Sequence, residues 1–124
     1  MKKIQLTGTD DTPGIILDAE NGIFEISGRS MPEDVEMFFD PILQWLENYA
    51  ENANEKIEFI FKMKYFNTAS SKLMLDVFMI LETIHENNNN VLIKWYYPEN
   101  DEDMEEAGEE YSDIVEIPFE HISY

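Results

Sequence analysis

The sequence predicts a mixed α/β fold in which one β-sheet is covered by helices mainly on one face. Segments with the two-residue period of strands alternate with segments of helical period, in the order β-β-α-β-α-β-α-β. Such alternation favours a mixed sheet with parallel neighbours. The segment 56–64 alternates apolar and polar residues, which indicates one buried face and argues against helices on both sides. With 124 residues in all, we expect a single domain spanning 1–124.

The first half of the chain begins with a polar, turn-rich segment at residues 7–12. Two short strand-like runs follow, at 15–17 and 23–26, and Asn21-Gly22 between them supplies the positive φ of a hairpin turn. A helix is expected over 33–51, because Pro32 and several acids precede apolar residues at helical spacing. Pro41 lies inside that pattern and is expected to kink the helix or to start it afresh.

The second half continues with the strand at 56–64, whose apolar face is formed by Ile57, Phe59, Phe61 and Met63. After a polar break at 67–71, a helix with a broad apolar face is expected over 72–86. A strand at 91–97 ends at Pro98. A short acidic helix at 100–111 and a closing strand or edge segment, containing Ile114, Ile117 and Phe119, complete the chain.

The composition excludes several classes of partner. There are 27 acidic residues against 8 basic ones, giving a formal net charge of -19. This charge repels phosphate backbones and anionic lipids, so nucleic acid and membrane surfaces are not expected as partners. The absence of cysteine excludes disulfides, thiolate metal sites and a cysteine nucleophile. No signal peptide or apolar run long enough to span a bilayer is present, so we expect a soluble, cytoplasmic protein.

No pattern in the sequence indicates catalysis. His85 and His121 lie outside any recognisable motif, and His85 near a helix C-terminus suits the helix dipole. The sequence has neither a phosphate-binding glycine motif nor a nucleophile elbow. We therefore expect no enzymatic activity and no cofactor. A small hydrolase built on an unrecognised acidic site is kept as a third reading.

The acidic segment 99–113 offers many carboxylate oxygens, but it lacks the ligand spacing and central glycine of a calcium loop. We interpret it as a solvated helix face and expect no metal site. A second hypothesis is that it forms an acidic docking surface for a partner, which would depend on side chains such as Glu102 and Glu106.

The most informative segment is the one without acids. No Asp or Glu occurs from Phe59 to Leu75, and three of the eight basic residues, Lys62, Lys64 and Lys72, lie in this window. They flank a polar turn that joins a strand to a helix. The turn contains Asn67, Thr68, Ala69, Ser70 and Ser71, and it places three hydroxyls at or near a helix N-terminus, where backbone N–H groups lack intrahelical partners.

These hydroxyls have two interpretations. Ser and Thr are common N-caps, and we expect one of the three to cap the helix. Alternatively, one hydroxyl is phosphorylated, because a phosphate gains from the helix dipole and free N–H groups while the lysines offset the acidic background. A phosphate would add about -1.5 to -2 charges at one surface point.

The segment Phe66-Asn67-Thr68-Ala69-Ser70-Ser71 after an alternating strand resembles the Leu-Asn-Thr-Ser-Ser phosphorylation segment of the SiaC family of bacterial regulatory phosphoproteins. Other pieces of the chain resemble the family in the same order, and together they cover nearly the whole sequence. They are Thr12-Pro13-Gly14-Ile15, Ser30-Met31-Pro32-Glu33-Asp34, Trp95-Tyr96-Tyr97 and Asp101-Glu102-Asp103-Met104.

The resemblance implies a fold similar to the STAS domain of anti-anti-sigma factors and a role as a partner switch. It implies that a cognate kinase phosphorylates Thr68 and that a PP2C-type phosphatase removes the phosphate. In the best-known arrangement of the family, the unphosphorylated form binds and activates a diguanylate cyclase, which links the switch to cyclic-di-GMP and biofilm behaviour. Ala69 departs from the serine common in the family, which bears on the kinase contacts more than on the acceptor.

The leading hypothesis from the sequence is therefore a phosphorylation-controlled partner switch acting through Thr68. Asn67, Ser70 and Ser71 are expected to shape the helix N-terminus, and Lys62, Lys64 and Lys72 to set the local field. The alternative is a constitutive acidic adaptor in which Thr68 is only a helix cap.

Overall fold

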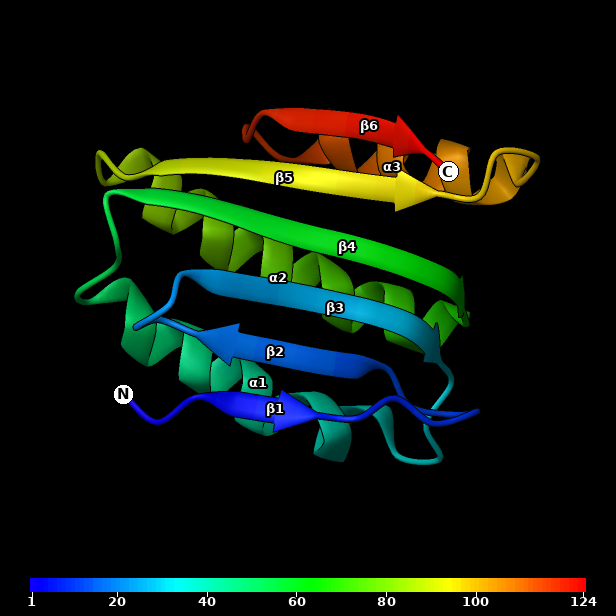
Figure 1. Cartoon of the computed structure of the whole chain (residues 1–124), viewed down its shortest axis with the longest axis horizontal. Helices are drawn as coiled ribbons and strands as arrows, with labels where there is room; N and C mark the ends of the chain where they lie inside the picture. The colour runs from blue at the N-terminus through cyan, green and yellow to red at the C-terminus, as the bar shows by residue number, and fades with distance from the viewer.

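The computed structural model describes all residues 1–124, and its centre is one six-stranded sheet with strands in sequence order, β1-β2-β3-β4-β5-β6. The first three strands are antiparallel neighbours, and β3 to β6 run parallel to one another. The strands are β1 (Ile4–Leu6), β2 (Gly14–Asp18), β3 (Ile23–Ser30), β4 (Lys56–Phe66), β5 (Asn90–Tyr97) and β6 (Phe119–Ser123) (Figure 1).

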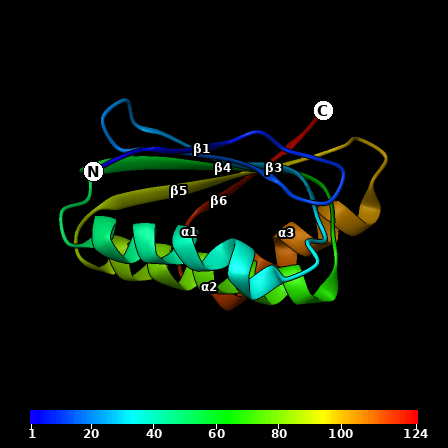
Figure 2. The same ribbon diagram turned by 90° about the horizontal axis from the view of Figure 1, so that it is seen from below.

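Three helices, α1 (Val35–Ala50), α2 (Thr68–Glu86) and α3 (Glu102–Ile114), connect the parallel strands. All three lie on the same side of the sheet, and the opposite side is open (Figure 2). The mixed α/β class and the one-sided helix layer predicted from the sequence are thus confirmed. None of the helices combines the length and hydrophobicity that crossing a membrane requires.

The core lies between the sheet and the helices. The alternation of β4 puts Ile57, Phe59, Phe61 and Met63 on the helix side, each at most 2% exposed, as the sequence predicted. The hairpin between β2 and β3 also matches the prediction, since Gly22 has φ +67°. A glycine adopts this left-handed conformation without the steric cost that a Cβ would impose.

The N-terminal strand β1 is absent from the predicted order, which starts one strand later. Ile4–Leu6 alternates over only three residues, too few for its periodicity to be recognised. The strand forms because Ile4 pairs with Leu17 of β2. The indole N–H of Trp45 in α1 also donates a hydrogen bond to the main-chain oxygen of Lys2 at 2.6 Å, which holds the N-terminus against the helix layer.

Helix α1 continues through Pro41, so of the two expectations, a kink or a fresh start, the fresh start is wrong. Proline removes the N–H that would bond to the carbonyl of Met37. Both residues are exposed, so water can satisfy that carbonyl on the solvent side of the helix. The helix begins at Val35, later than the predicted residue 33, because Asp34 is its N-cap and accepts a hydrogen bond from Met37 N at 3.1 Å.

The closing segment was also placed incorrectly. Ile114 is the last residue of α3, and Ile117 is buried in the connection that follows. Strand β6 begins only at Phe119, because Pro118 has no N–H for a strand ladder, although its carbonyl accepts from Ile93 N at 3.0 Å.

Candidate functional site

The candidate site is the start of α2, where the chain turns from the end of β4 into the helix. The helix begins at Thr68, four residues before the predicted start at residue 72. Its N-cap is Asn67, whose side-chain oxygen accepts a hydrogen bond from Ser70 N at 2.8 Å. The expectation that Thr68, Ser70 or Ser71 caps the helix is therefore wrong. Asn67 has the extended backbone of an N-cap (φ -84°, ψ 174°), which places its amide oxygen over the first turn.

Ser70 is fully buried and bonds across the molecule to the end of β3. Its hydroxyl donates to the main-chain oxygen of Ser30 at 2.9 Å, and the Ser30 hydroxyl donates to Ser70 Oγ at 2.8 Å. The same Ser30 carbonyl accepts from Asn67 N at 3.1 Å. Three hydrogen bonds thus attach the first turn of α2 to β3, and both serine side chains are 0% exposed.

Thr68 has the opposite environment. It is the first residue of α2, its side chain is exposed, and no hydrogen bond to its hydroxyl is present. The Ser71 hydroxyl instead donates to the main-chain oxygen of Thr68 at 2.7 Å, so that hydroxyl is already engaged. Within the first turn, only the Thr68 hydroxyl is both exposed and unbonded.

An aromatic cluster supports this turn from below. Phe66, the last residue of β4, lies edge-on to Trp95 and tilted against Tyr111, with ring centroids 6.4 Å apart in both pairs. The Tyr111 hydroxyl donates to the main-chain oxygen of Ser71 at 2.8 Å, which joins α3 to the first turn of α2. Burial raises the pKa of Tyr111 above its ordinary value, so the phenol stays protonated as a donor.

A shallow groove of about 370 Å³ runs between the start of α2 and helix α3. Apolar side chains from both helices and from the end of β4 line it, together with polar side chains from the first turn of α2. Its lining residues include Phe66, Thr68, Lys72, Leu75, Glu110 and Ile114. Ile114 is 60% exposed, an unusual degree for an isoleucine beside a core.

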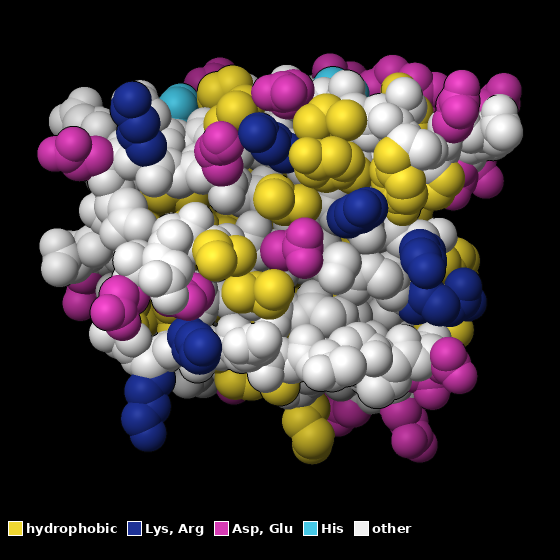
Figure 3. Space-filling view, in the orientation of Figure 1, with side chains coloured by type: hydrophobic (Ala, Val, Ile, Leu, Met, Phe, Trp, Pro, Cys, Tyr) yellow, Lys and Arg dark blue, Asp and Glu magenta, His cyan; other side chains and the backbone are white.

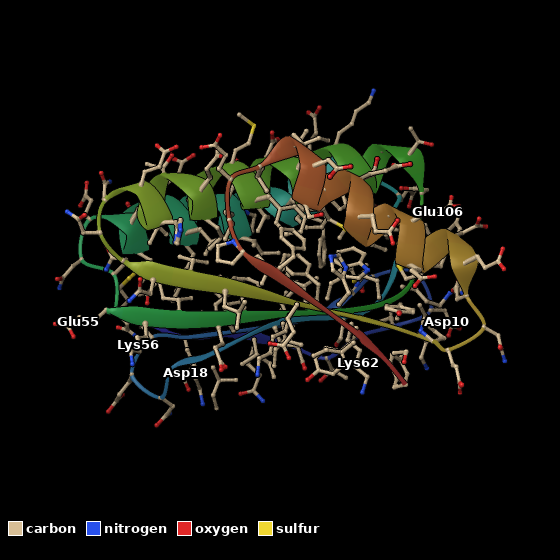
Figure 4. The ribbon with its side chains drawn as sticks, turned by 90° about the horizontal axis from the view of Figure 1, so that it is seen from above. Asp10, Asp18, Glu55, Lys56, Lys62 and Glu106 are labelled. Atoms are coloured by element: carbon tan, nitrogen blue, oxygen red, sulfur yellow. The ribbon has the colours of Figure 1, made fainter.

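Of the three lysines expected near this turn, Lys62, Lys64 and Lys72, only one lines the groove. Lys72 lines it together with Thr68. Lys64 lies in a neighbouring hollow with Asp101 and Asp103, at the start of α3. Lys62 projects from the other face of the sheet, where its ammonium lies 4.5 Å from the centre of the Tyr124 ring (Figure 4). Strand alternation explains this separation, because Lys62 is one residue from the buried Phe61 and Met63.

The window that lacks acids in the sequence does not lack them in space. Glu110 of α3 lines the same groove as Thr68 and Lys72. The neighbouring Glu106 projects from α3 toward solvent (Figure 4). The groove beside the first turn of α2 is therefore lined by one lysine of α2 and by one acid of α3.

Sequence reasoning missed Ser30, Glu110 and Tyr111 as parts of the site. The parallel register of β3 and β4, with Ser30 beside Phe66, brings Ser30 to the helix start, and no local pattern reveals that register. Tyr111 ends the acidic helix expected at 100–111, and helical periodicity carries no information about the partner of its hydroxyl.

The histidine and the acidic segment considered in the sequence analysis have structural roles. His85 Nδ1 accepts a hydrogen bond from Val91 N at 3.1 Å, which ties the end of α2 to β5. No three His, Asp or Glu side chains are grouped so as to hold a metal ion. The acids of the segment 99–113 lie along α3, where Asp101 is the N-cap and accepts from Met104 N at 3.0 Å.

Comparison with known proteins identifies the class of protein to which this fold and helix start belong. The sequence model of the family described as SiaC family regulatory phosphoprotein matches residues 6–124. The chain belongs to this family. An uncharacterised protein of Pseudomonas aeruginosa (strain UCBPP-PA14) is 29% identical over 119 residues, which cover 96% of this chain and 94% of that protein.

Solved structures agree with the sequence match over the whole chain. SiaC of Pseudomonas aeruginosa is 27% identical, with a TM-score of 0.90 and full coverage of both chains. A chain in the crystal structure of the diguanylate cyclase SiaD in complex with its activator SiaC, from the same organism, is 28% identical. Its TM-score is 0.91, over 98% of this chain and 99% of that chain. The resemblance drawn from the sequence is thus confirmed at the level of the family; its likeness to STAS domains stays a prediction.

Proposed function

We propose that this protein is a partner switch controlled by reversible phosphorylation of Thr68. The observation that carries the proposal is the difference between the hydroxyls of one helical turn. Ser70 is sealed in the core and Ser71 is bonded to the backbone, whereas the Thr68 hydroxyl is exposed and free. A kinase can reach that oxygen without unfolding the helix.

A phosphate on Thr68 would change the groove in two ways. It would lie next to the first N–H groups of α2, which have no intrahelical acceptor, and would gain from the helix dipole. It would also introduce about -1.5 to -2 charges into a groove that Lys72 and Glu110 line as well. The lysine attracts the phosphate and the glutamate repels it, so a partner seated in the groove would meet a different field in each state.

We place the partner surface across the start of α2, with Asn67, Ser70 and Ser71 holding the shape of the turn. SiaC of Pseudomonas aeruginosa is the activator of the diguanylate cyclase SiaD. By this likeness, the effector is a diguanylate cyclase bound by the unphosphorylated protein, and the output is cyclic-di-GMP signalling in biofilm regulation. A cognate kinase and a PP2C-type phosphatase would supply the chemistry in the cytoplasm, and the switch, one domain over residues 1–124, would itself catalyse nothing.

The alternative is a constitutive adaptor in which Thr68 only caps its helix. The N-cap in the structure is Asn67, so Thr68 does not cap the helix. This assignment favours the switch, because a capping role no longer explains an exposed threonine at this position.

Affinity capture with unphosphorylated and enzymatically phosphorylated protein tests the proposal. A switch exchanges partners between the two states, and Thr68→Ala keeps the unphosphorylated set after kinase treatment. Thr83→Ala is the matched control, because Thr83 is an exposed threonine near the other end of α2 and should leave the exchange intact. Capture of the same partners in both states would support the adaptor and overturn the switch.

A further inference from the structure

The face of the sheet opposite the helices has no covering layer. Strands β3 to β6 are parallel, and parallel strands are normally covered on both faces. Here α1, α2 and α3 all cover the same side (Figure 2). We call the uncovered side the open face. The register of the sheet shows which side chains project from it, and these side chains resemble those of a protein interface more than those of a solvated surface.

The open face carries apolar side chains on five consecutive strands. Strand alternation places isoleucines there from β2, β3, β4 and β6 and a leucine from β5, and the Ile23 side chain is 47% exposed. Tyrosines lie toward one end of the face, where Tyr65 and Tyr124 are 44% and 47% exposed. Tyrosine and arginine among apolar residues are characteristic of protein interfaces. The apolar residues are Ile16, Ile23, Ile60, Leu92 and Ile122.

The open face is balanced in charge although the protein is not. The register directs four of the eight basic residues to this face, together with four acids. The net charge of -19 is therefore carried by the rest of the molecule. Hydrophobic side chains lie across the middle of this face among Lys and Arg, while most Asp and Glu lie toward its rim (Figure 3). The charged residues are Arg29, Lys56, Lys62, Lys94, Asp18, Glu25, Glu58 and Glu120.

One row of this face is antisymmetric in charge about its centre. Glu25 of β3 is paired with Ile60 of β4, and Ile60 is paired with Lys94 of β5. The row thus reads acid, apolar, base across three strands. A two-fold rotation about an axis along β4 in front of Ile60 would place Glu25 of one copy opposite Lys94 of the other. The same rotation would set Ile60 against Ile60, Ile23 against Leu92 and Glu58 against Glu58. Each Glu58 carboxylate is held toward β5 by an ion pair with Lys94 of its own chain at 3.2 Å, so Glu25 of the second copy would join an existing pair.

We propose that a second copy of this chain covers the open face, and that two sheets pack face to face about this axis. A two-fold interface needs a self-complementary surface, which the row supplies. Aligned sheets pack about 10 Å apart. The acidic helix layers then lie on the outside of the dimer, separated by more than the Debye length of about 8 Å at physiological salt.

The aromatic rings explain how Lys62 fits such an interface although it lies close to the axis. Its ammonium lies 4.5 Å from the centre of the Tyr124 ring and 5.7 Å from that of Tyr96. Cation–π contacts hold the charge over these rings and direct it toward β5 and the C-terminus. The Lys62 ammonium is thereby turned away from its own symmetry mate.

Sedimentation velocity over a range of concentrations tests the dimer. The wild-type protein should form dimers, and more so at physiological than at low salt, because screening weakens repulsion between the acidic layers. Ile60→Lys should weaken dimerisation about tenfold or more, since it sets like charges against each other at the axis. Met79→Lys is the matched control, because Met79 is 52% exposed on the helix side.

A charge exchange makes the test independent of folding defects. Glu25→Lys and Lys94→Glu should each weaken the dimer, with circular dichroism confirming the fold of each. The double variant should recover part of the loss, because a glutamate at position 94 lies beside Glu58 of its own chain, to which Lys94 is ion-paired. A wild-type protein that remains monomeric at all concentrations and salts would overturn the proposal, as would a double variant no better than the singles. Neither result bears on Thr68, which lies in the helix layer.

Discussion

The hydroxyl of Ser70 donates a hydrogen bond to the main-chain oxygen of Ser30, forty residues earlier in the chain, and receives one from the Ser30 hydroxyl. This pair fixes the first turn of α2 against the end of β3. It thereby determines where Thr68 is displayed, two residues before Ser70 and on the outside of the same turn.

Ser70→Ala should destabilise the protein by about 1–3 kcal/mol, because it leaves buried polar groups of Ser30 without their partner. Ser30→Ala combined with Ser70→Ala should cost less than the sum of the single changes, since the pair is lost as a unit. Urea denaturation measures these differences. Ser71→Ala is the control in the same turn, and a loss as large as that of Ser70→Ala would contradict this account.

Gly108→Ala should also destabilise the protein, although alanine normally favours a helix over glycine by about 0.5–1 kcal/mol. A Cβ at Gly108 would lie 2.5 Å from the indole ring of Trp95, which is buried and donates to Met104 O at 2.9 Å. Helix α3 would have to move away from the sheet, at a cost of about 1–3 kcal/mol.

Thermal unfolding measures the Gly108 effect, and Glu109→Ala is the control at the next, exposed position. A Gly108→Ala protein that melts at or above the wild-type temperature would show that α3 is not held as close to Trp95 as described.

The two hydrogen bonds that Asp18 accepts from Asn21 predict a pH dependence of stability. They lower the pKa of the Asp18 carboxyl in the folded protein. A lowered folded pKa stabilises the protein above the unfolded value, near pH 4, and this contribution is lost as the pH falls through the folded pKa. The stability difference between wild type and Asp18→Asn should therefore be larger at neutral pH than in strong acid. Denaturation series at several pH values measure it, and a difference independent of pH would refute the assignment.

Substitutions of Thr68 should separate the two partner states. Thr68→Ala should hold the protein in its unphosphorylated partner set. Thr68→Asp should mimic the phosphate only partly, because an aspartate carries less charge and fewer acceptor oxygens. Binding of the effector measured by titration calorimetry should be unchanged in Thr68→Ala and weakened in Thr68→Asp. Equal affinity for both variants would mean that a negative charge at this position does not control binding.

Much of the fold could be predicted from local patterns. The alternation of β4, the Asn21-Gly22 turn and the apolar stripes of α1 and α2 each depend on residues close in sequence, and each matches the structure. Strand β1 and the start of β6 could not be predicted in the same way. The first is a three-residue strand formed by pairing, and the second depends on where Pro118 falls relative to the ladder.

The candidate site too could be predicted only where it depends on residues close in sequence. Sequence reasoning found the turn at 67–71 but expected a hydroxyl cap, because Ser and Thr cap helices about as often as Asn. Only the three-dimensional structure shows that Ser70 is buried, that the Thr68 hydroxyl is free and that Lys62 lies on the open face. It also brought Glu110 into a groove that the sequence had suggested was free of acids.

Phosphopeptide mapping of the protein isolated from its native host is the direct test for a reversible phosphate on Thr68. Intact-mass analysis gives the fraction modified, and fragmentation of the peptide containing residues 66–72 assigns the phosphate to Thr68, Ser70 or Ser71. We expect a phosphate on Thr68 whose occupancy changes with growth conditions, with Ser70 unmodified. A protein that carries no phosphate on Thr68 under any growth condition, with its cognate kinase present, would contradict it.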